Sequence, residues 1–282
     1  GRSSRRRYRC GSWSLGEPDF GAPPAVRDAM REQYDGRLLP YTAAMACRNY
    51  VRRFPISTRN ATMWTSIRKR IAITAGGSTA LLLAAALTVD EGDEVLIADP
   101  SYPCNRELVR AFGGEVVDVP TNADTRFHLT PELCREYWSD RTKAVMITSP
   151  SNPTGTTIAF DTLKSVCDLA KERGAWRIVD ETYLDLADRE PDGSDVKSVL
   201  ACDPDAIVCS SFSKFFGMTG WRLGWMVVPE CALEAMDESR HQLLPVRAYT
   251  HPACGARVLH SGNVGRVRGT PSGVAGASSH CG

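Results

Sequence analysis

A single lysine, Lys214, lies among small hydroxyl residues in the segment SSFSKFFGMTGWRLGW at 210–225, with two glycines and an arginine spaced behind it. The lysine follows an apolar run, and a strand end rich in serine and glycine is a poor place for a lysine that serves solubility alone. A lysine amine in such surroundings can act as a nucleophile. The sequence therefore singles out Lys214 as a candidate reactive group.

Polar segments follow the other apolar runs in the same way. They are DPSYPCN (99–105), SPSNPTG (149–155) and DETY (180–183). In open α/β sheets, ligands bind beyond the carboxyl ends of the strands, so these segments are expected to form one site. The glycine-rich turn in TAGGSTALLL (74–83) precedes an apolar helix and could aim free N–H groups at an anion. A tight turn before a core helix explains that segment about as well.

The elements that must position these residues alternate between strands and helices from residue 90 to about 238, which is typical of an α/β fold. Strands are predicted at 94–99, 115–120, 144–150, 176–181, 206–212 and 223–228, and helices at 105–113 and 160–174. The strands are continuous apolar runs, which indicates burial on both faces and a mostly parallel sheet covered by helices.

Composition excludes few functions. The 282 residues include 34 basic and 33 acidic side chains, so the net charge of +1 gives no argument for binding nucleic acid or a membrane. The longest apolar run, 80–89, is too short to cross a bilayer and is predicted to be a buried helix. Ten cysteines and five histidines show no metal-ligand spacing, so the cysteines are expected to be reduced packing residues and no metal site is predicted.

The arginine-rich N-terminus lacks the long apolar core of a secretory signal. A cytoplasmic protein is therefore expected, with a transit peptide as the alternative.

Three motifs follow one another along the chain: SNPTG (151–155), DETY (180–183) and SFSKFFGMTGWRLG (211–224). Their order and approximate spacing match those of one enzyme family. In these motifs the chain resembles the class I and II aminotransferases, which are fold type I enzymes dependent on pyridoxal 5'-phosphate (PLP). The resemblance implies a three-layer α/β large domain with a mostly parallel mixed sheet, and a small domain that is expected to be incomplete in this chain. It also implies a homodimer and transfer of an amino group between an α-amino acid and a 2-oxo acid.

The resemblance also implies roles for the residues that carry chemistry. Lys214 would form a Schiff base with PLP and move the proton of the substrate Cα. Asp180 would pair with the pyridine nitrogen, which agrees with the cost of burying an unpaired charge at a strand end. Tyr183 and Asn152 would hydrogen-bond the phenolic oxygen, although a plain turn asparagine is the alternative for Asn152. Tyr102 would stack on the ring, with a core tyrosine as its alternative.

The phosphate and substrate contacts are implied in the same way. The phosphate would be bound by Gly77, Ser78, Thr79, Ser211 and Arg222. Gly16 would meet the substrate carboxylate with its backbone, and Tyr41 would reach the phosphate of the neighbouring subunit. Gly217, Gly220 and Gly224 would let the backbone pass close to the ligand, or serve as ordinary turn glycines.

Two stretches depart from the family pattern. Residues 36–89 contain no acidic residue, and 46–67 lose the expected helix pattern although the length is kept. Residues 239–282 contain no Asp, Glu or Lys, and the arginine that binds the substrate carboxylate in the family cannot be assigned. A shifted reading frame or a divergent loop would explain 46–67. We therefore divide the chain into an arm (1–40), a PLP-binding domain (41–240) and a disordered, non-family tail (241–282), and expect weak transaminase activity.

Three alternatives stay open from the sequence. A PLP lyase or decarboxylase could use the same fold, because the site around the cofactor decides the reaction. A non-catalytic PLP-binding module or an inactive fragment would also carry these motifs. The amino acid substrate cannot be named from the sequence.

Overall fold

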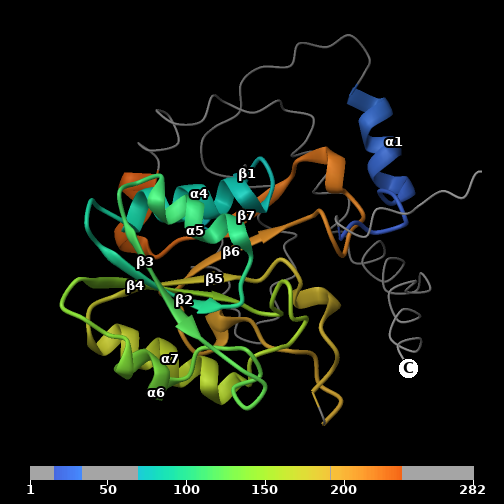
Figure 1. The fold of residues 1–282 in the computed structure, drawn as a ribbon. Helices are drawn as coiled ribbons and strands as arrows, with labels where there is room; N and C mark the ends of the chain where they lie inside the picture. Colours follow the sequence, from blue (N-terminus) through green and yellow to red (C-terminus); the bar gives the residue numbers. More distant parts are fainter. Residues whose placement is uncertain (1–15, 34–68, 191, 237–282) are drawn as a thin grey trace, which may run out of the picture.

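The computed structural model describes residues 16–33, 69–190 and 192–236. Seven strands form one sheet in the order β1-β7-β6-β5-β4-β2-β3 (Figure 1). They are β1 (Ile71–Thr74), β2 (Glu94–Asp99), β3 (Glu115–Pro120), β4 (Thr142–Thr148), β5 (Trp176–Asp180), β6 (Ile207–Ser211) and β7 (Gly224–Val227). Only β7 is antiparallel to its neighbours, β1 and β6. The predicted mostly parallel α/β sheet is confirmed.

Helices cover both faces of the sheet, which gives three layers (Figure 1). One face carries α4 (Gly77–Thr88) and α5 (Pro103–Arg110), and the other carries α6 (Pro131–Glu136) and α7 (Phe160–Glu172). Helix α1 (Pro24–Gln33) lies at one end of the sheet. Short 3-10 turns occur at η1 (Leu184–Leu186), η2 (Val199–Ala201), η3 (Thr219–Trp221) and η4 (Glu230–Ala232).

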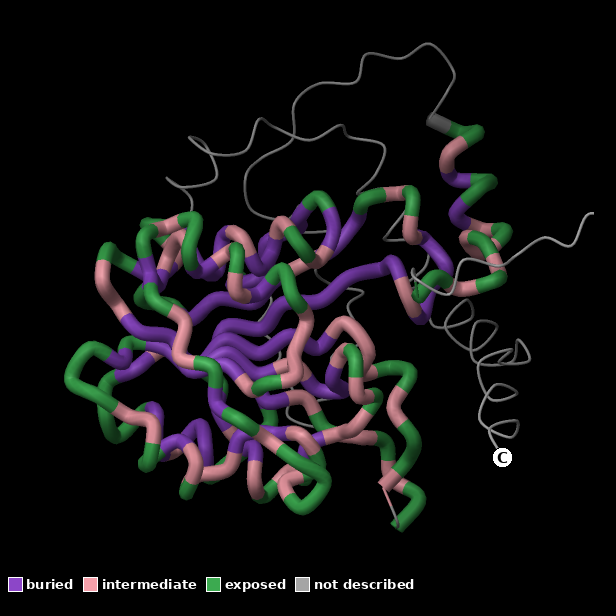
Figure 2. Tube along the Cα trace, viewed as in Figure 1, coloured by how far each residue is buried: buried purple, intermediate pink, exposed green. Residues whose placement is uncertain are grey.

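Six of the described strands are largely buried because their side chains alternate between two apolar layers. The edge strand β3 differs: only Val119 of its residues is buried, so the two-sided burial expected for 115–120 is wrong. In β4, Val145 and Ile147 pack with α6 and α7, whereas Ala144 and Met146 pack with α4. Figure 2 shows the resulting band of buried strands between the two helical layers. This two-sided burial explains why the strands are visible in the sequence as continuous apolar runs.

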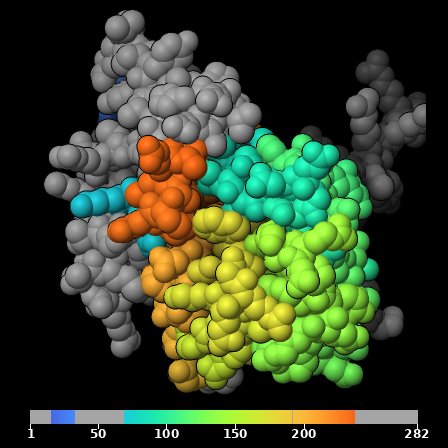
Figure 3. Space-filling model, turned by 90° about the vertical axis from the view of Figure 1, so that its left-hand side faces the viewer, coloured from blue at the N-terminus to red at the C-terminus, as the bar shows by residue number. Residues whose placement is uncertain are grey.

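The sheet brings distant parts of the chain together at its β1 edge. The amide of Val228 donates to the carbonyl of Arg70 at 3.1 Å, and Ala232 and Met236 join the apolar layer that contains α4. In Figure 3 the orange segment around residue 230 lies directly beside the blue-green segment that includes α4. The last described residues are therefore part of the same core as the glycine-rich turn.

The sequence predictions hold with small shifts. The six predicted strands are present, and α5 starts two residues before its predicted beginning. The predicted buried helix is α4. The six cysteines in the described ranges are free thiols, but Cys104 and Cys231 are exposed and therefore are not the packing residues expected from the sequence. None of the helices in those ranges is long and apolar enough to span a bilayer.

Candidate active site

Lys214 lies on a loop that joins β6 to β7 and is fixed by buried side chains. Phe212, Phe216 and Met218 have at most 2% of their surface exposed, and the rings of Phe212 and Phe216 are 5.1 Å apart. Between these anchors Lys214 is only half-buried, so its side chain is the part of the loop that can reach a ligand. The loop lies at the carboxyl end of β6, as the sequence predicts.

The amine of Lys214 donates a hydrogen bond to the carbonyl of Gly16 and lies 5.7 Å from the centre of the Tyr183 ring. Burial lowers the pKa of this amine below its usual range, Glu17 opposes that shift, and Arg222 adds to it. A lowered pKa raises the fraction of neutral amine at physiological pH, and the neutral amine is the nucleophile. The structure therefore places an amine with a lowered pKa next to Gly16, the predicted substrate contact.

The glycine-rich turn and Arg222 form a cradle for an anion. Gly76 has a φ of 88° and precedes the first turn of α4, which contains Gly77, Ser78 and Thr79. A Cβ atom on Gly76 would lie 2.5 Å from Nη2 of Arg222, and one on Gly77 would lie 3.3 Å from the Cβ of Ser211. The guanidinium, the serine and the free N–H groups of α4 therefore converge on one point, which suits a phosphate.

Not every hydroxyl among the residues predicted to bind the phosphate is free to contact a ligand. The Thr79 hydroxyl donates to the carbonyl of Ala75 at 3.1 Å. Ser78 is exposed at the start of α4, and the Ser211 hydroxyl accepts the amide of Ser213 at 3.2 Å. Ser211 can still donate its proton, whereas Thr79 contributes its backbone N–H group to the cradle.

Gly224 matters because two backbones meet there. A Cβ on Gly224 would lie 2.5 Å from the carbonyl carbon of Gly76 and 2.8 Å from the amide nitrogen of Gly77. Gly217, with a φ of 62°, is equally crowded by Phe20, whereas no described atom lies within 4 Å of a Cβ on Gly220. Contacts within the chain are enough to require glycine at Gly217 and Gly224, and the close approach of these glycines to a ligand stays a prediction.

We predict that Gly224→Ala lowers the free energy of unfolding by about 1–3 kcal/mol, because the added methyl group must push α4 away from β7. The same movement spreads the anion cradle, so PLP affinity should fall as well. Urea unfolding and a PLP titration measure the two effects. Gly220→Ala is the matched control, and equal behaviour of the two variants would contradict the crowding argument.

Asp180 ends β5 as a buried carboxylate. It has 6% of its surface exposed, and its Oδ1 accepts the amide of Thr182 at 3.0 Å. Burial raises the pKa of Asp180 above its usual range, and the hydrogen bonds from Thr182 counteract only part of this shift. Within 16–33, 69–190 and 192–236, no lysine or arginine forms an ion pair with it. A buried carboxylate without a basic partner is costly unless a ligand supplies the cation.

Tyr183 and the turn that contains Asn152 lie beside Asp180. Burial raises the pKa of Tyr183, and the charge of Asp180 adds to this effect. Thr148, the last residue of β4, is in register with Asp180, and the amide of Ser149 donates to the Asp180 carbonyl at 3.0 Å. The 149–155 turn therefore starts at the end of β5, with Asn152 half-buried within it.

Tyr102, on the turn before α5, lies near Asp180 and Tyr183. A hydrogen bond with Cys104, together with burial, raises the pKa of Tyr102 to about 12, and Asp180 is near enough to contribute. Arg106 holds this turn, because its guanidinium lies 2.8 Å from Asp99 and 2.6 Å from Asp118. These two ion pairs hold the turn against β2 and β3. Tyr102 itself is half-buried.

The structure brings together most of the predicted site. Two residues of interest, Gly76 and Glu181, were not predicted as site residues. The pair of adjacent glycines in the sequence could have indicated Gly76. Tyr41 and the arginines beyond residue 236 lie outside the described residues. Within those residues no cluster of three or more His, Cys, Asp or Glu side chains could hold a metal ion.

Comparison with known proteins identifies the family. The family model described as aminotransferase class I and II matches residues 10–261. This chain belongs to that family. The match to the aminotransferases also spans 46–67 and continues into the 239–282 segment, where the motifs are hardest to recognise.

Among the curated relatives is the valine–pyruvate aminotransferase of Mycobacterium tuberculosis, which is 33% identical over 79% of this chain and 57% of its own length. The aspartate aminotransferase of Sulfolobus acidocaldarius is 33% identical over 87% of the chain and 60% of its own length. A solved aminotransferase from Mycobacterium tuberculosis has a TM-score of 0.81 and 28% identity, covering 90% of this chain and 65% of that one. The chain therefore spans about three-fifths of the length of these curated relatives.

Members of the family use PLP, and the residues of this site fit that cofactor. A side chain on Gly76 would collide with the Arg222 guanidinium, so the glycine leaves the cradle at the start of α4 free for a phosphate. Asp180 supplies a buried negative charge of the kind that a protonated pyridine nitrogen would pair with. Lys214 supplies the amine that the aldehyde of the cofactor requires.

Proposed function

We propose that this chain is an aminotransferase that binds PLP through Lys214 and moves an amino group between an α-amino acid and a 2-oxo acid. The observation that carries the proposal is a half-buried lysine of lowered pKa in one site with the unpaired buried carboxylate of Asp180 and the anion cradle at α4. We assign this site to a PLP-binding domain at 41–240, preceded by an arm at 1–40 and followed by a tail at 241–282, the first part of which lies within the family match that ends at residue 261.

Bound PLP supplies an aldehyde that reacts with amines and a ring that accepts electrons from the substrate Cα. Lys214 would hold PLP through that aldehyde and, when a substrate amine takes its place, its free amine would move the proton between the substrate Cα and the cofactor carbon. Asp180 would keep a proton on the ring nitrogen, and Tyr183 and Asn152 would donate hydrogen bonds to the phenolic oxygen. The phosphate would be held by Ser211, Arg222 and the amides of Gly77, Ser78 and Thr79, and Tyr102 would stack on the ring.

The names of the relatives favour transfer of the amino group over a lyase, a decarboxylase or a non-catalytic module. We test this by incubating the purified chain and PLP with ¹⁵N-labelled amino acids and an unlabelled 2-oxo acid. Transfer of ¹⁵N to the 2-oxo acid is expected. Release of labelled ammonia or of CO₂ without transfer would indicate a lyase or a decarboxylase, and no exchange of the Cα proton would indicate an inactive chain.

We also propose a homodimer, because Tyr41 resembles a tyrosine that reaches the phosphate of a neighbouring subunit. PLP affinity should then rise with protein concentration over the range in which dimers form. Sedimentation velocity combined with PLP titration measures both quantities. A monomer that binds PLP as tightly as a dimer contradicts the proposal. The cytoplasmic location expected from the sequence stays a prediction for cell fractionation.

A further inference from the structure

Glu181 directly follows Asp180 and is buried, with 8% of its surface exposed. Its Oε1 accepts the amide of Val199, in η2, at 2.7 Å. Its own amide donates to the carbonyl of Cys209 at 2.8 Å, and its carbonyl accepts the hydroxyl of Ser210 at 3.2 Å. The backbone of residue 181 therefore connects the end of β5 with β6, and its carboxylate connects the same point with η2.

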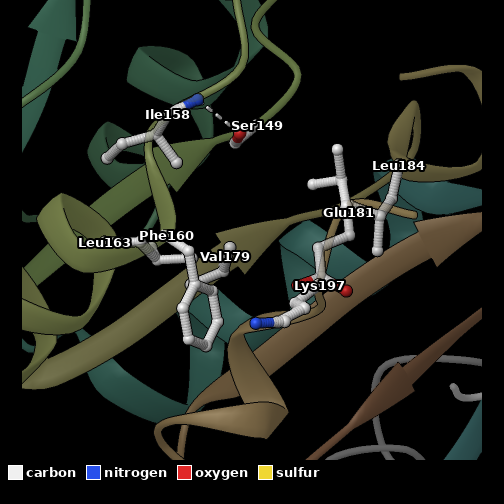
Figure 4. A pocket seen from close by; sticks show the side chains of 9 residues that line it. Ser149, Ile158, Phe160, Leu163, Val179, Glu181, Leu184 and Lys197 are labelled. Carbon is white, nitrogen blue, oxygen red and sulfur yellow. Dashed lines mark hydrogen bonds between the residues drawn. The ribbon is translucent and has the colours of Figure 1, made fainter. Parts of the chain in front are cut away.

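The two acidic side chains at the end of β5 serve different surroundings. Asp180 is close to Tyr102 and Tyr183, whereas Glu181 lines a small pocket with Phe160 and Leu163 of α7. Figure 4 shows the Glu181 carboxylate in this pocket, pointing toward the segment that carries Lys197. The contacts of Glu181 therefore hold the end of β5 from the side opposite to the candidate active site.

The carboxylate of Glu181 is not neutralised by a nearby cation. Lys197 places its amine 4.9 Å from the centre of the Phe160 ring, and no ion pair involves Glu181 in the described part of the chain. Burial raises the pKa of Glu181 to about 7, while the hydrogen bonds from Val199 and Ser198 counteract this shift. The carboxyl group thus acts here as a hydrogen-bond acceptor whose geometry matters more than its charge.

We propose that Glu181 is a positioning residue: its carboxylate ties the end of β5 to η2, the turn that leads into β6, and so locks the two strand ends and fixes Asp180 relative to the loop that carries Lys214. Asp180 ends β5 and Ser211 ends β6. A shift between these two strand ends would change the distance from Asp180 to the amine and the phosphate site together. The catalytic consequence rests on the function proposed above, whereas the locking of the strands does not.

The test compares Glu181→Ala, Glu181→Gln and Asp203→Ala with the wild-type chain. Gln keeps the length of the side chain and an oxygen that can accept the Val199 amide, whereas Ala removes the acceptor. Asp203 is a matched buried carboxylate at the other end of β5, where its oxygens lie 2.7 and 3.1 Å from the guanidinium nitrogens of Arg177. Loss of Asp203 destabilises the fold at the end of β5 far from the site. It also removes the acceptor of the Asp205 amide, so exchange at 203–206 is left out of the comparison.

Two measurements are made on each variant. Amide hydrogen exchange of the chain without PLP reports the strand ends, and Glu181→Ala should exchange at 178–182 and 199–211 about tenfold faster or more. The pH titration of absorbance with PLP bound reports the charges around the cofactor, and its midpoint should shift by about half a pH unit or more in Glu181→Ala. Glu181→Gln should resemble the wild type in both.

Unchanged exchange in Glu181→Ala overturns the locking of the strands, and an unchanged midpoint overturns its consequence for Asp180. A midpoint shift of equal size in Asp203→Ala also overturns the proposal, since general destabilisation would then explain it. Glu181→Gln behaving like Glu181→Ala would overturn the role of the acceptor. A wild-type chain that forms no bond with PLP refutes the proposed function instead, and hydrogen exchange still decides the role of Glu181.

Discussion

Lys214→Ala is expected to abolish covalent attachment of PLP and to slow amino transfer by about 10³-fold or more. The variant loses both the amine that binds the cofactor and the group that moves the substrate proton. Borohydride reduction turns the bond between lysine and cofactor into a stable amine, so peptide mapping of the reduced wild-type chain should find the label on Lys214.

Lys197→Ala is the control for Lys214, because Lys197 is an exposed lysine whose amine contacts the Phe160 ring. That variant should keep the label and the activity. A label on another lysine of the wild-type chain, or a labelled Lys214→Ala variant, would show that the attachment site is assigned wrongly.

Asp180→Asn is expected to leave PLP bound while slowing exchange of the substrate Cα proton by about 10²- to 10⁴-fold. Asparagine keeps the shape and can still accept the Thr182 amide, but it cannot hold a proton on the ring nitrogen. Loss of Cα deuterium from a labelled amino acid, followed by NMR, measures the rate. An unchanged rate would show that the carboxylate has another role.

The same substitution has an opposite expected effect on stability. Burial raises the pKa of Asp180, so the ionised carboxylate makes folding less favourable in the chain without PLP. Asp180→Asn should therefore unfold at the same or a higher urea concentration than the wild type in the absence of the cofactor. Asp188→Asn, which changes an exposed carboxylate eight residues later, should alter neither the exchange rate nor the stability.

The strands and the motifs that follow them could be predicted because two-sided burial leaves a continuous apolar run, and because chemistry-bearing residues gather at strand ends. β1 was not predicted, since its four residues are too short a pattern to stand out. The polar segments of Tyr102, Asn152, Asp180 and Lys214 were predicted as one group because parallel strands present their carboxyl ends at the same edge.

Contacts between distant segments could not be predicted in the same way. The sequence places Glu181 beside Asp180 but does not show that its side chain accepts the amide of Val199, 18 residues later. It also does not show that Gly224 packs against Gly76, because a turn glycine and a crowded glycine look alike in a sequence. Such residues depend on tertiary geometry, so they become visible only in the folded chain.

The pairing of β1 with β7 determines when the cofactor site can form during folding. Ile71 pairs with Val227, so strands separated by more than 150 residues of the chain must meet before Arg222 can reach the turn at Gly76. Contacts this distant in sequence form slowly, because a long loop must be closed first. Until β7 has paired with β1, the phosphate cradle is incomplete, because Arg222 lies just before β7. Binding of PLP is therefore a late event, and it marks chains in which the whole sheet has been assembled.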